Sequence, residues 1–132
     1  MKDYVLDASA LMTFFENRAG AEKVEKLLTG AADANGLLAM SVINWSEVYY
    51  SIWRAHGEKA AGNKLQEIAQ LPIQFFDVDM NMARQAASLK ARYNLPYADC
   101  FAAALAQARK STVVTSDKDF ERTGASIKIL WV

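Results

Sequence analysis

The chain has 132 residues, of which 52% are hydrophobic, so it can bury a core without disulfides or a structural metal. This composition excludes intrinsic disorder, which needs low hydrophobicity and high net charge. Fifteen Lys and Arg balance fifteen Asp and Glu. Taken alone, this balance argues against nucleic-acid binding through bulk positive charge, because phosphate affinity comes mainly from cations that displace counterions. We expect a single domain over residues 1–132.

The rarer residues exclude several classes of site. The one cysteine, Cys100, cannot form an internal disulfide or a zinc site of several cysteines. The one histidine, His56, excludes a metal site built on two histidines. Acidic residues interrupt the N-terminal apolar stretch, so we expect no secretory signal, and no apolar run approaches the roughly 20 residues that span a bilayer. These observations predict a soluble, cytoplasmic protein.

The spacing of apolar residues predicts strands alternating with helices. In chain order, we expect a strand at 3–7, helices at 8–17 and 21–29, a strand at 37–41, helices at 44–56 and 58–70, a strand at 73–78, helices holding 82–89 and 98–106, a strand at 112–115, a short helix at 117–122 and a strand at 127–132. Such alternation predicts an α/β fold with a mostly parallel central sheet flanked by helices, because parallel neighbours need crossover connections.

Particular residues are expected to set the ends of these helices. Gly30 should end the second helix, and either Ser41 or Asn44 should cap the helix at 44–56. Pro96 is expected where a first-turn proline is tolerated.

Four acidic residues follow apolar elements at the places where α/β proteins bind ligands. Asp7 is the last residue of the first strand, and Asp117 directly follows a later strand. Asp99 lies in the first turn of an Ala-rich helix, where the helix dipole stabilises an ionised carboxylate, and Glu47 lies near the start of another helix. Ligands of parallel sheets bind at the carboxyl ends of the strands, so this edge is where chemistry is expected.

Taken singly, each acid has a structural explanation, since Asp at a strand-to-helix junction is a common N-cap and Glu47 alone would be a solvent-facing helix residue. Together they are like charges with no excess of cations, and such charges raise one another's pKa unless a cation intervenes. Mg²⁺ or Mn²⁺ is the natural cation for oxygen ligands, and Mg²⁺ also takes substrate phosphate oxygens. The set therefore predicts a metal site that handles phosphates. Asp33, Asp77 and Asp79 are expected to be caps or turns.

The order of four motifs resembles a known family. The motifs are Asp7 in Val-Leu-Asp-Ala-Ser-Ala-Leu, Glu47 in Asn-Trp-Ser-Glu-Val, Asp99 in Tyr-Ala-Asp-Cys-Phe-Ala-Ala-Ala and Asp117 in Val-Val-Thr-Ser-Asp-Lys-Asp-Phe. In this order the chain resembles the PIN-domain ribonucleases, specifically the VapC-type toxins of toxin–antitoxin pairs. The resemblance covers essentially the whole chain. It implies a three-layer PIN-like sandwich and an acidic pocket that binds one or two Mg²⁺ or Mn²⁺ ions and cleaves RNA.

The resemblance also implies roles for individual residues. Asp7, Glu47, Asp99 and Asp117 match the family's acidic quartet, with catalytic and metal-binding roles. Supporting roles fall to three further residues, namely Ser9, Thr115 and Asp119. Asp117 and Asp119 both remain candidates for the fourth acid. The implied partners are an RNA substrate, a cognate antitoxin protein and a second copy of the chain in a homodimer.

Other functions for a small α/β domain with clustered acids are a receiver-type signalling domain, a haloacid-dehalogenase-type phosphatase and a non-catalytic metal-binding module. A receiver needs an acid after the mid-chain strand, where this sequence has Ser-Val-Ile-Asn. A phosphatase of the second kind needs Asp two residues after the first, where Ser9 stands. A binding module remains an alternative if the acids are only caps.

Two further patterns bear on partners. The helix at 44–56 carries a stripe of residues that can all be core, namely Val48, Tyr49, Ile52 and Trp53. Tyr50 points away from this stripe, and so many large aromatic rings indicate a face that is partly an interface. If four or five acids gather in one pocket, the 15 cations outnumber the 10 or 11 acids elsewhere. Candidates for a phosphate-facing rim are Arg54, Lys59, Lys64, Arg92 and Lys118.

Overall fold

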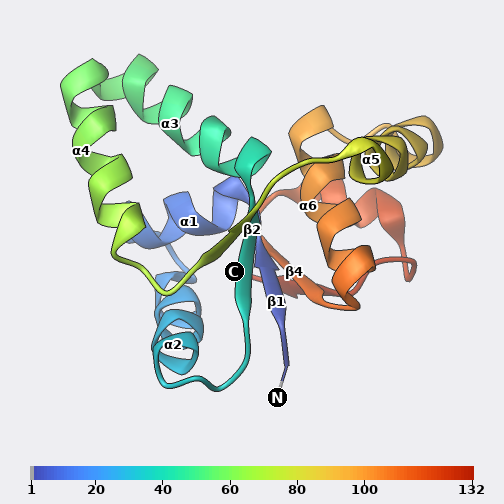
Figure 1. Ribbon diagram of the computed structural model, residues 1–132, viewed down its shortest axis with the longest axis horizontal. Helices are drawn as coiled ribbons and strands as arrows, with labels where there is room; N and C mark the ends of the chain where they lie inside the picture. Colours follow the sequence, from blue (N-terminus) through green and yellow to red (C-terminus); the bar gives the residue numbers. More distant parts are fainter. Residues whose placement is uncertain (1) are drawn as a thin grey trace.

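The computed structural model describes residues 2–132, and a five-stranded sheet lies at its centre (Figure 1). The strand order is β3-β2-β1-β4-β5, and every neighbouring pair is parallel. The strands are β1 (Tyr4–Leu6), β2 (Leu38–Ser41), β3 (Gln74–Phe76), β4 (Thr112–Thr115) and β5 (Ile129–Trp131). The expected α/β class with a parallel sheet is confirmed.

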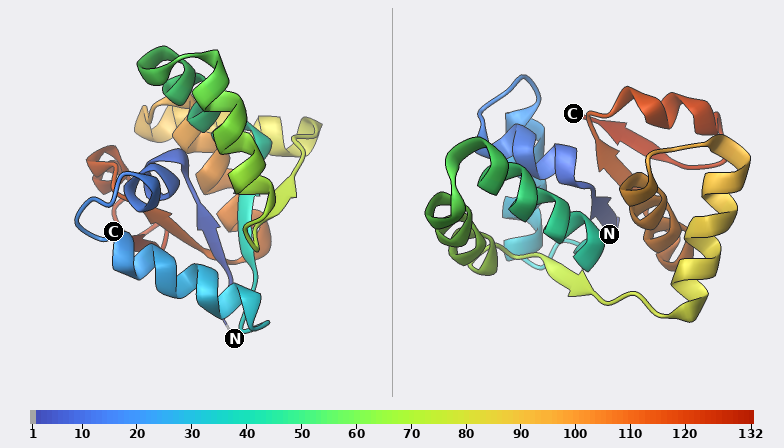
Figure 2. Two further views of the ribbon diagram at one scale, coloured as in Figure 1. Left: turned by 90° about the vertical axis from the view of Figure 1, so that its left-hand side faces the viewer. Right: turned by 90° about the horizontal axis from the view of Figure 1, so that it is seen from above.

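Helices cover both faces of this sheet, as the views in Figures 1 and 2 show. They are α1 (Ala8–Phe15), α2 (Ala21–Ala32), α3 (Val42–His56), α4 (Glu58–Ala69), α5 (Met80–Tyr93), α6 (Tyr97–Arg109) and the 3₁₀ helix η1 (Lys118–Thr123). One apolar core joins the sheet to α1–α4, and a second joins it to α5, α6 and η1. Across residues 2–132, no helix is long and apolar enough to cross a membrane.

The alternation of side chains along the strands explains why the molecule has two cores. Val5 and its neighbour in register on β4, Val113, face α5 and α6. The next residue on each strand, Leu6 and Val114, faces α1–α4. Successive side chains of a strand point to opposite faces, so apolar runs in the strands bury both faces at once.

Helix α6 is the most buried helix of the second core. Residues 99–106 are all buried, and four of them are alanines. Small side chains let the helix lie close to β1, β2 and β4, so the expected small-residue face is confirmed. This close packing fixes the N-terminus of α6, and with it Asp99, at the carboxyl edge of the sheet.

Helix α2 ends later than the sequence indicates. It continues past Gly30 to Ala32, and the expectation that Gly30 ends it is wrong. Gly30 does not adopt a positive φ, whereas Ala34 does, at 59°. The left-handed residue that closes this end of the helix therefore comes four positions after the glycine.

The caps of the other helices resolve the open expectations. Ser41 caps α3, because its Oγ accepts a hydrogen bond from the Ile43 N–H at 3.1 Å, while Asn44 lies buried inside the helix. Asp79 caps α5 as expected. Pro96 is the N-cap of α6 and lies just before its first turn, one position from where the sequence suggests.

The strand order separates this fold from the receiver alternative. Receiver domains have the order 2-1-3-4-5, whereas β1 here lies at the centre, between β2 and β4. The receiver interpretation is therefore wrong. The order reverses between β1 and β4, and ligands of open parallel sheets bind at such a switch point, beyond the carboxyl ends of the strands.

Gly36 fixes the entry to β2 against the N-terminal segment. Its φ is +104°, and a Cβ at this position would lie 2.1 Å from the Lys2 carbonyl oxygen. We predict that Gly36→Ala lowers the free energy of unfolding by more than about 1 kcal/mol, because both the backbone and the neighbour must shift. Gly62→Ala in α4 is the control, since nothing lies near its Cβ and alanine favours helix by about 0.5–1 kcal/mol. Urea unfolding checks both, and equal stability of Gly36→Ala and wild type would contradict the prediction.

Candidate active site

Asp7 lies at the switch point, between the end of β1 and the start of α1, and its side chain is only 1% exposed. Its Oδ1 accepts hydrogen bonds from the Ala10 N–H at 2.9 Å and the Ser9 hydroxyl at 2.7 Å. Its Oδ2 accepts one from the Thr115 hydroxyl at 2.5 Å. Asp7 is thus an N-cap, as its position allows, but three donors also hold its carboxylate in one orientation.

Thr115 and Ser9 connect the ends of β1 and β4. While it donates to Asp7, the Thr115 hydroxyl accepts a hydrogen bond from the Asp117 N–H at 2.9 Å. The Ser9 hydroxyl accepts one from the Ser116 N–H at 2.9 Å. The chain after β4 is therefore fastened to Asp7, which places Asp117 beside it.

Asp99 lies in the first turn of α6, and only 4% of its surface is exposed. Its Oδ2 is buried and has no hydrogen-bond partner. A buried carboxylate oxygen without a donor is costly. Asp99 is therefore an acceptor held ready for a ligand that the protein itself does not supply.

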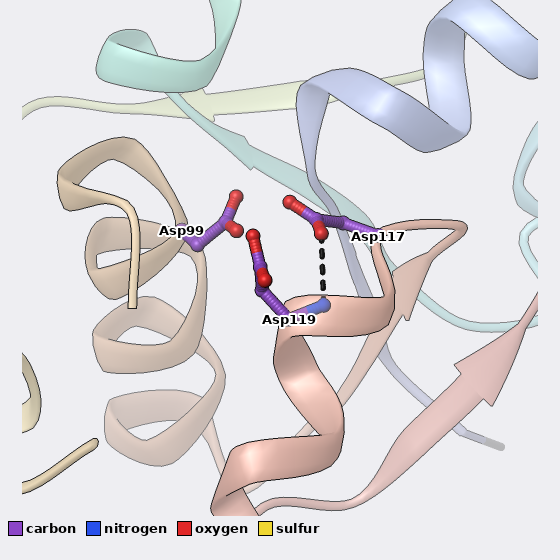
Figure 3. A group of neighbouring side chains, drawn as sticks. All are labelled: Asp99, Asp117 and Asp119. Atoms are coloured by element: carbon purple, nitrogen blue, oxygen red, sulfur yellow. Dashed lines mark hydrogen bonds between the residues drawn. The ribbon is translucent and has the colours of Figure 1, made fainter. Parts of the chain in front are cut away.

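Asp117 and Asp119 face Asp99 from the start of η1 (Figure 3). One carboxylate oxygen from each of the three residues lies within 4.8 Å of the others. The Asp117 Oδ1 accepts a hydrogen bond from the Asp119 N–H at 2.9 Å, which caps η1 and holds the two acids together. The sequence leaves Asp117 and Asp119 as alternatives for the fourth acid, with Asp119 in a supporting role, and oxygens of both lie where they can hold a metal.

Glu47 approaches the same group from α3. Its pKa is raised above the usual value by partial burial and by the negative charge of Asp117, so the two carboxyl groups interact. Three residues earlier on the same helix, the buried Asn44 donates from Nδ2 to the Ala98 carbonyl oxygen at 3.1 Å. This bond joins α3 to α6 immediately before Asp99. From the sequence, Asn44 is a candidate cap and the first residue of the Glu47 motif, and no local pattern indicates its bond to α6.

Crowding shifts the pKa values of these acids in opposite directions. Burial, the Asp117 carboxyl group and the charges of Asp7 and Glu47 raise the pKa of Asp99 to about 9. Burial raises the pKa of Asp7 to about 6, although its hydrogen bonds act in the other direction. Burial also acts to raise the pKa of Asp117, but the adjacent Asp99 carboxyl group, the hydrogen bond from the Asp119 N–H and the charge of Arg122 lower it overall. The group therefore favours an added cation.

The donor set fits Mg²⁺ or Mn²⁺. Every candidate ligand atom is a carboxylate oxygen, and one of them, on Asp99, is buried without a partner. Hard divalent cations prefer such ligands, whereas zinc and copper sites favour nitrogen and sulfur. The single cysteine, Cys100, points its Sγ toward the Leu95 carbonyl oxygen instead.

The aromatic side chains of helix α3 are buried and exposed only partly as expected. Tyr50 is 52% exposed, which confirms that it points away from the core, but Trp53 is 43% exposed and does not belong to the core. Trp53 instead packs edge-on against Tyr49, with ring centroids 5.5 Å apart. A single row of aromatic residues on this helix therefore continues from the core onto the surface.

Comparison with known proteins gives a family and a set of similar structures. A family model described as "PIN domain" matches residues 4–126. No curated protein matches the sequence closely enough to be compared with it.

Several solved structures have the same fold. A DNA-bound VapBC from Salmonella typhimurium is 18% identical, with a TM-score of 0.76 over 99% of this chain and 98% of that one. VapBC2 from Rickettsia felis, bound to a promoter DNA fragment, is 18% identical, with a TM-score of 0.74 over 97% of each chain. VapC20 from Mycobacterium tuberculosis, a toxin that cleaves the sarcin-ricin loop, is 16% identical, with a TM-score of 0.71 over 92% of this chain and 95% of that one. These likenesses confirm the fold.

The raised pKa values predict how stability depends on pH without metal. Because the pKa values of Asp7 and Asp99 lie above 3.8, the folded chain keeps protons that the unfolded chain has released. The free energy of unfolding in EDTA should therefore fall as the pH rises from about 4 to 9. Asp99 has the larger upward pKa shift and so causes most of this loss of stability. Asp99→Asn removes that loss, so it should be more stable than wild type at pH 8, by more than about 1 kcal/mol.

Urea unfolding in EDTA at several pH values checks this prediction. Asp77→Asn is the control, because Asp77 is exposed in the segment between β3 and α5 and does not belong to the acidic group. It should keep the pH dependence of wild type. An Asp99→Asn variant that loses stability with pH as steeply as wild type would contradict the prediction.

Proposed function

Since this chain belongs to the PIN domain family, we propose that it is a Mg²⁺- or Mn²⁺-dependent endoribonuclease that acts in the cytoplasm as the toxin of a toxin–antitoxin pair. The observation that carries the proposal is the buried, unpartnered Asp99 oxygen facing other carboxylates at the switch point of a parallel sheet. Sites of oxygen ligands that hold Mg²⁺ commonly serve to handle phosphates. Hydrolysis of phosphodiester bonds fits this chemistry.

The catalytic and metal-binding residues in this proposal are Asp7, Glu47, Asp99 and Asp117, with Asp119 beside them. When bound, a divalent cation offsets the charge on phosphate oxygens and makes water a better nucleophile near neutral pH. The chain's own contribution is orientation. Ser9, Thr115 and the Ala10 N–H hold the Asp7 carboxylate fixed, so little rearrangement is needed when substrate binds.

The charge distribution supports an RNA substrate that binds weakly outside the metal site. Among the rim candidates, Lys118 is exposed in η1 between Asp117 and Asp119, beside the acidic group. Lys64 is engaged elsewhere, over the Phe15 ring at 4.4 Å to its centroid and in an ion pair with Glu67. With no excess of cations overall, we expect affinity for RNA to depend strongly on the metal and little on bulk charge.

Cleavage assays on purified protein test the enzymatic proposal. Wild type should cut RNA with Mn²⁺ or Mg²⁺ and should be inactive in EDTA. Asp99→Asn should cut at least about 100-fold more slowly, because several kcal/mol of transition-state stabilisation depend on the ion. Asp77→Asn should cut as fast as wild type, and DNA of the same sequence should be cut more slowly than RNA.

Induced expression with sequencing of new RNA 5′ ends tests the toxin role in cells. Wild type should arrest growth and generate new ends, whereas Asp99→Asn should do neither. Full activity of wild type in EDTA, or of Asp99→Asn with metal, would contradict a metal-dependent nuclease. Growth without arrest and without new ends would contradict a toxin.

We further propose that the chain binds an antitoxin protein and forms a homodimer. Structural neighbours from Klebsiella pneumoniae, Rickettsia felis and Salmonella typhimurium are toxin–antitoxin or VapBC assemblies. The exposed aromatic residues Tyr50 and Trp53 on α3 are of the type enriched at protein interfaces. Light scattering at micromolar concentration should give about twice the 14.6 kDa mass of the chain, and a monomer mass would contradict the homodimer.

A further inference from the structure

Arg122 forms two contacts beside the acidic group. Its Nη2 pairs with the Asp119 Oδ1 at 3.1 Å, and its Nη1 donates to the Asn94 carbonyl oxygen at 2.7 Å. Within residues 2–132, it is the one cation that forms an ion pair with an acid of the group Asp99, Asp117 and Asp119. Its planar guanidinium therefore joins η1 to the end of α5.

The Asn94 carbonyl belongs to the segment that leads into α6 and Asp99. Asn94 is the left-handed C-cap of α5, and Leu95 and Pro96 connect it to α6. The Lys90 Nζ holds the same segment through the Leu95 carbonyl oxygen at 2.6 Å. Arg122 thus connects the segment before Asp99 to η1, the helix that carries Asp119. Asp99 on α6 and Asp119 on η1 approach each other beside this connection (Figure 3).

We propose that Arg122 is a positioning residue for the metal site, an inference that rests on the proposed metal-dependent function. It orients Asp119 through one nitrogen and fixes the approach of α6 through the other. Removal of the outer groups that hold metal ligands in place typically changes metal affinity by about 10–100-fold. Neither Arg122 nor the Asn94 carbonyl belongs to the motifs that suggested the site.

The two possible roles of Arg122, as a positive charge or as a positioning residue, predict opposite changes in metal affinity when it is removed. If Arg122 acted only as a positive charge, its loss would leave the carboxylates more attractive to a divalent cation, and the cation would bind more tightly. If it holds Asp119 and the α6 segment in place, its loss leaves them free to separate, and the cation binds more weakly. The sign of the change in affinity therefore distinguishes the two roles.

Calorimetric titration of the purified protein with MnCl₂, without RNA, measures this sign. We expect Arg122→Met to weaken Mn²⁺ binding about 10-fold. Arg122→Lys should also weaken it, because a lysine keeps the charge but lacks the planar fork that reaches two acceptors at once. Arg18→Met is the matched control, since it removes an exposed Arg–Glu pair between Arg18 and Glu16 without touching the acidic group, and it should bind Mn²⁺ as wild type does.

A second background tests whether Arg122 acts through Asp119. In an Asp119→Asn protein, Arg122→Met should weaken Mn²⁺ binding much less than it does in wild type. The Asp119 carboxylate that Arg122 orients is already lost there. Thermal unfolding in EDTA shows whether each variant is folded. Unchanged or tighter binding by folded Arg122→Met would overturn the inference. Absence of Mn²⁺ binding by wild type would instead overturn the proposed function on which the inference rests.

Discussion

Carboxyl groups that follow β1 and β4 and lie on α3 and α6 interact where the sheet reverses its strand order. Burial and their mutual repulsion raise the pKa values of Asp7, Glu47 and Asp99. The protein offsets this repulsion unevenly. Asp7 receives three hydrogen bonds, and Asp117 receives one from the Asp119 N–H and lies near the charge of Arg122, while an oxygen of the buried Asp99 receives none. The burial of α6 and the hydrogen bond from Asn44 to the Ala98 carbonyl oxygen fix the start of α6 and Asp99, while the Thr115 hydroxyl holds Asp117 at the end of β4.

Much of this arrangement could be predicted from the sequence, because it follows from local rules. The period of the apolar residues identified every strand and helix, and small residues marked α6 as a buried helix. Acids directly after strands reach the carboxyl edge of a parallel sheet whatever the order of the strands, which is why Asp7 and Asp117 could be located in advance. Asp99 followed from its place in the first turn of α6.

The features that the sequence did not predict depend on contacts between distant parts of the chain, or on a backbone conformation that the residue type does not determine. Gly30 has the residue type of a helix end, but it keeps the helical backbone, and helix α2 continues. The pairing of Arg122 with the Asn94 carbonyl joins residues 28 positions apart, so no local motif reports it. Whether Asp117, Asp119 or both lie beside Asp99 depends on the capping turn at Asp117, which brings Asp119, two residues later, back toward Asp99.

A crystal structure with MnCl₂, measured at the manganese absorption edge, tests the central claim most directly, since anomalous scattering identifies the ion independently of activity. We expect an anomalous peak within coordination distance of carboxylate oxygens of Asp99 and Asp117, with the Asp99 Oδ2 among the ligands of the ion. A peak elsewhere, or none while the carboxylates keep the same arrangement, would contradict it.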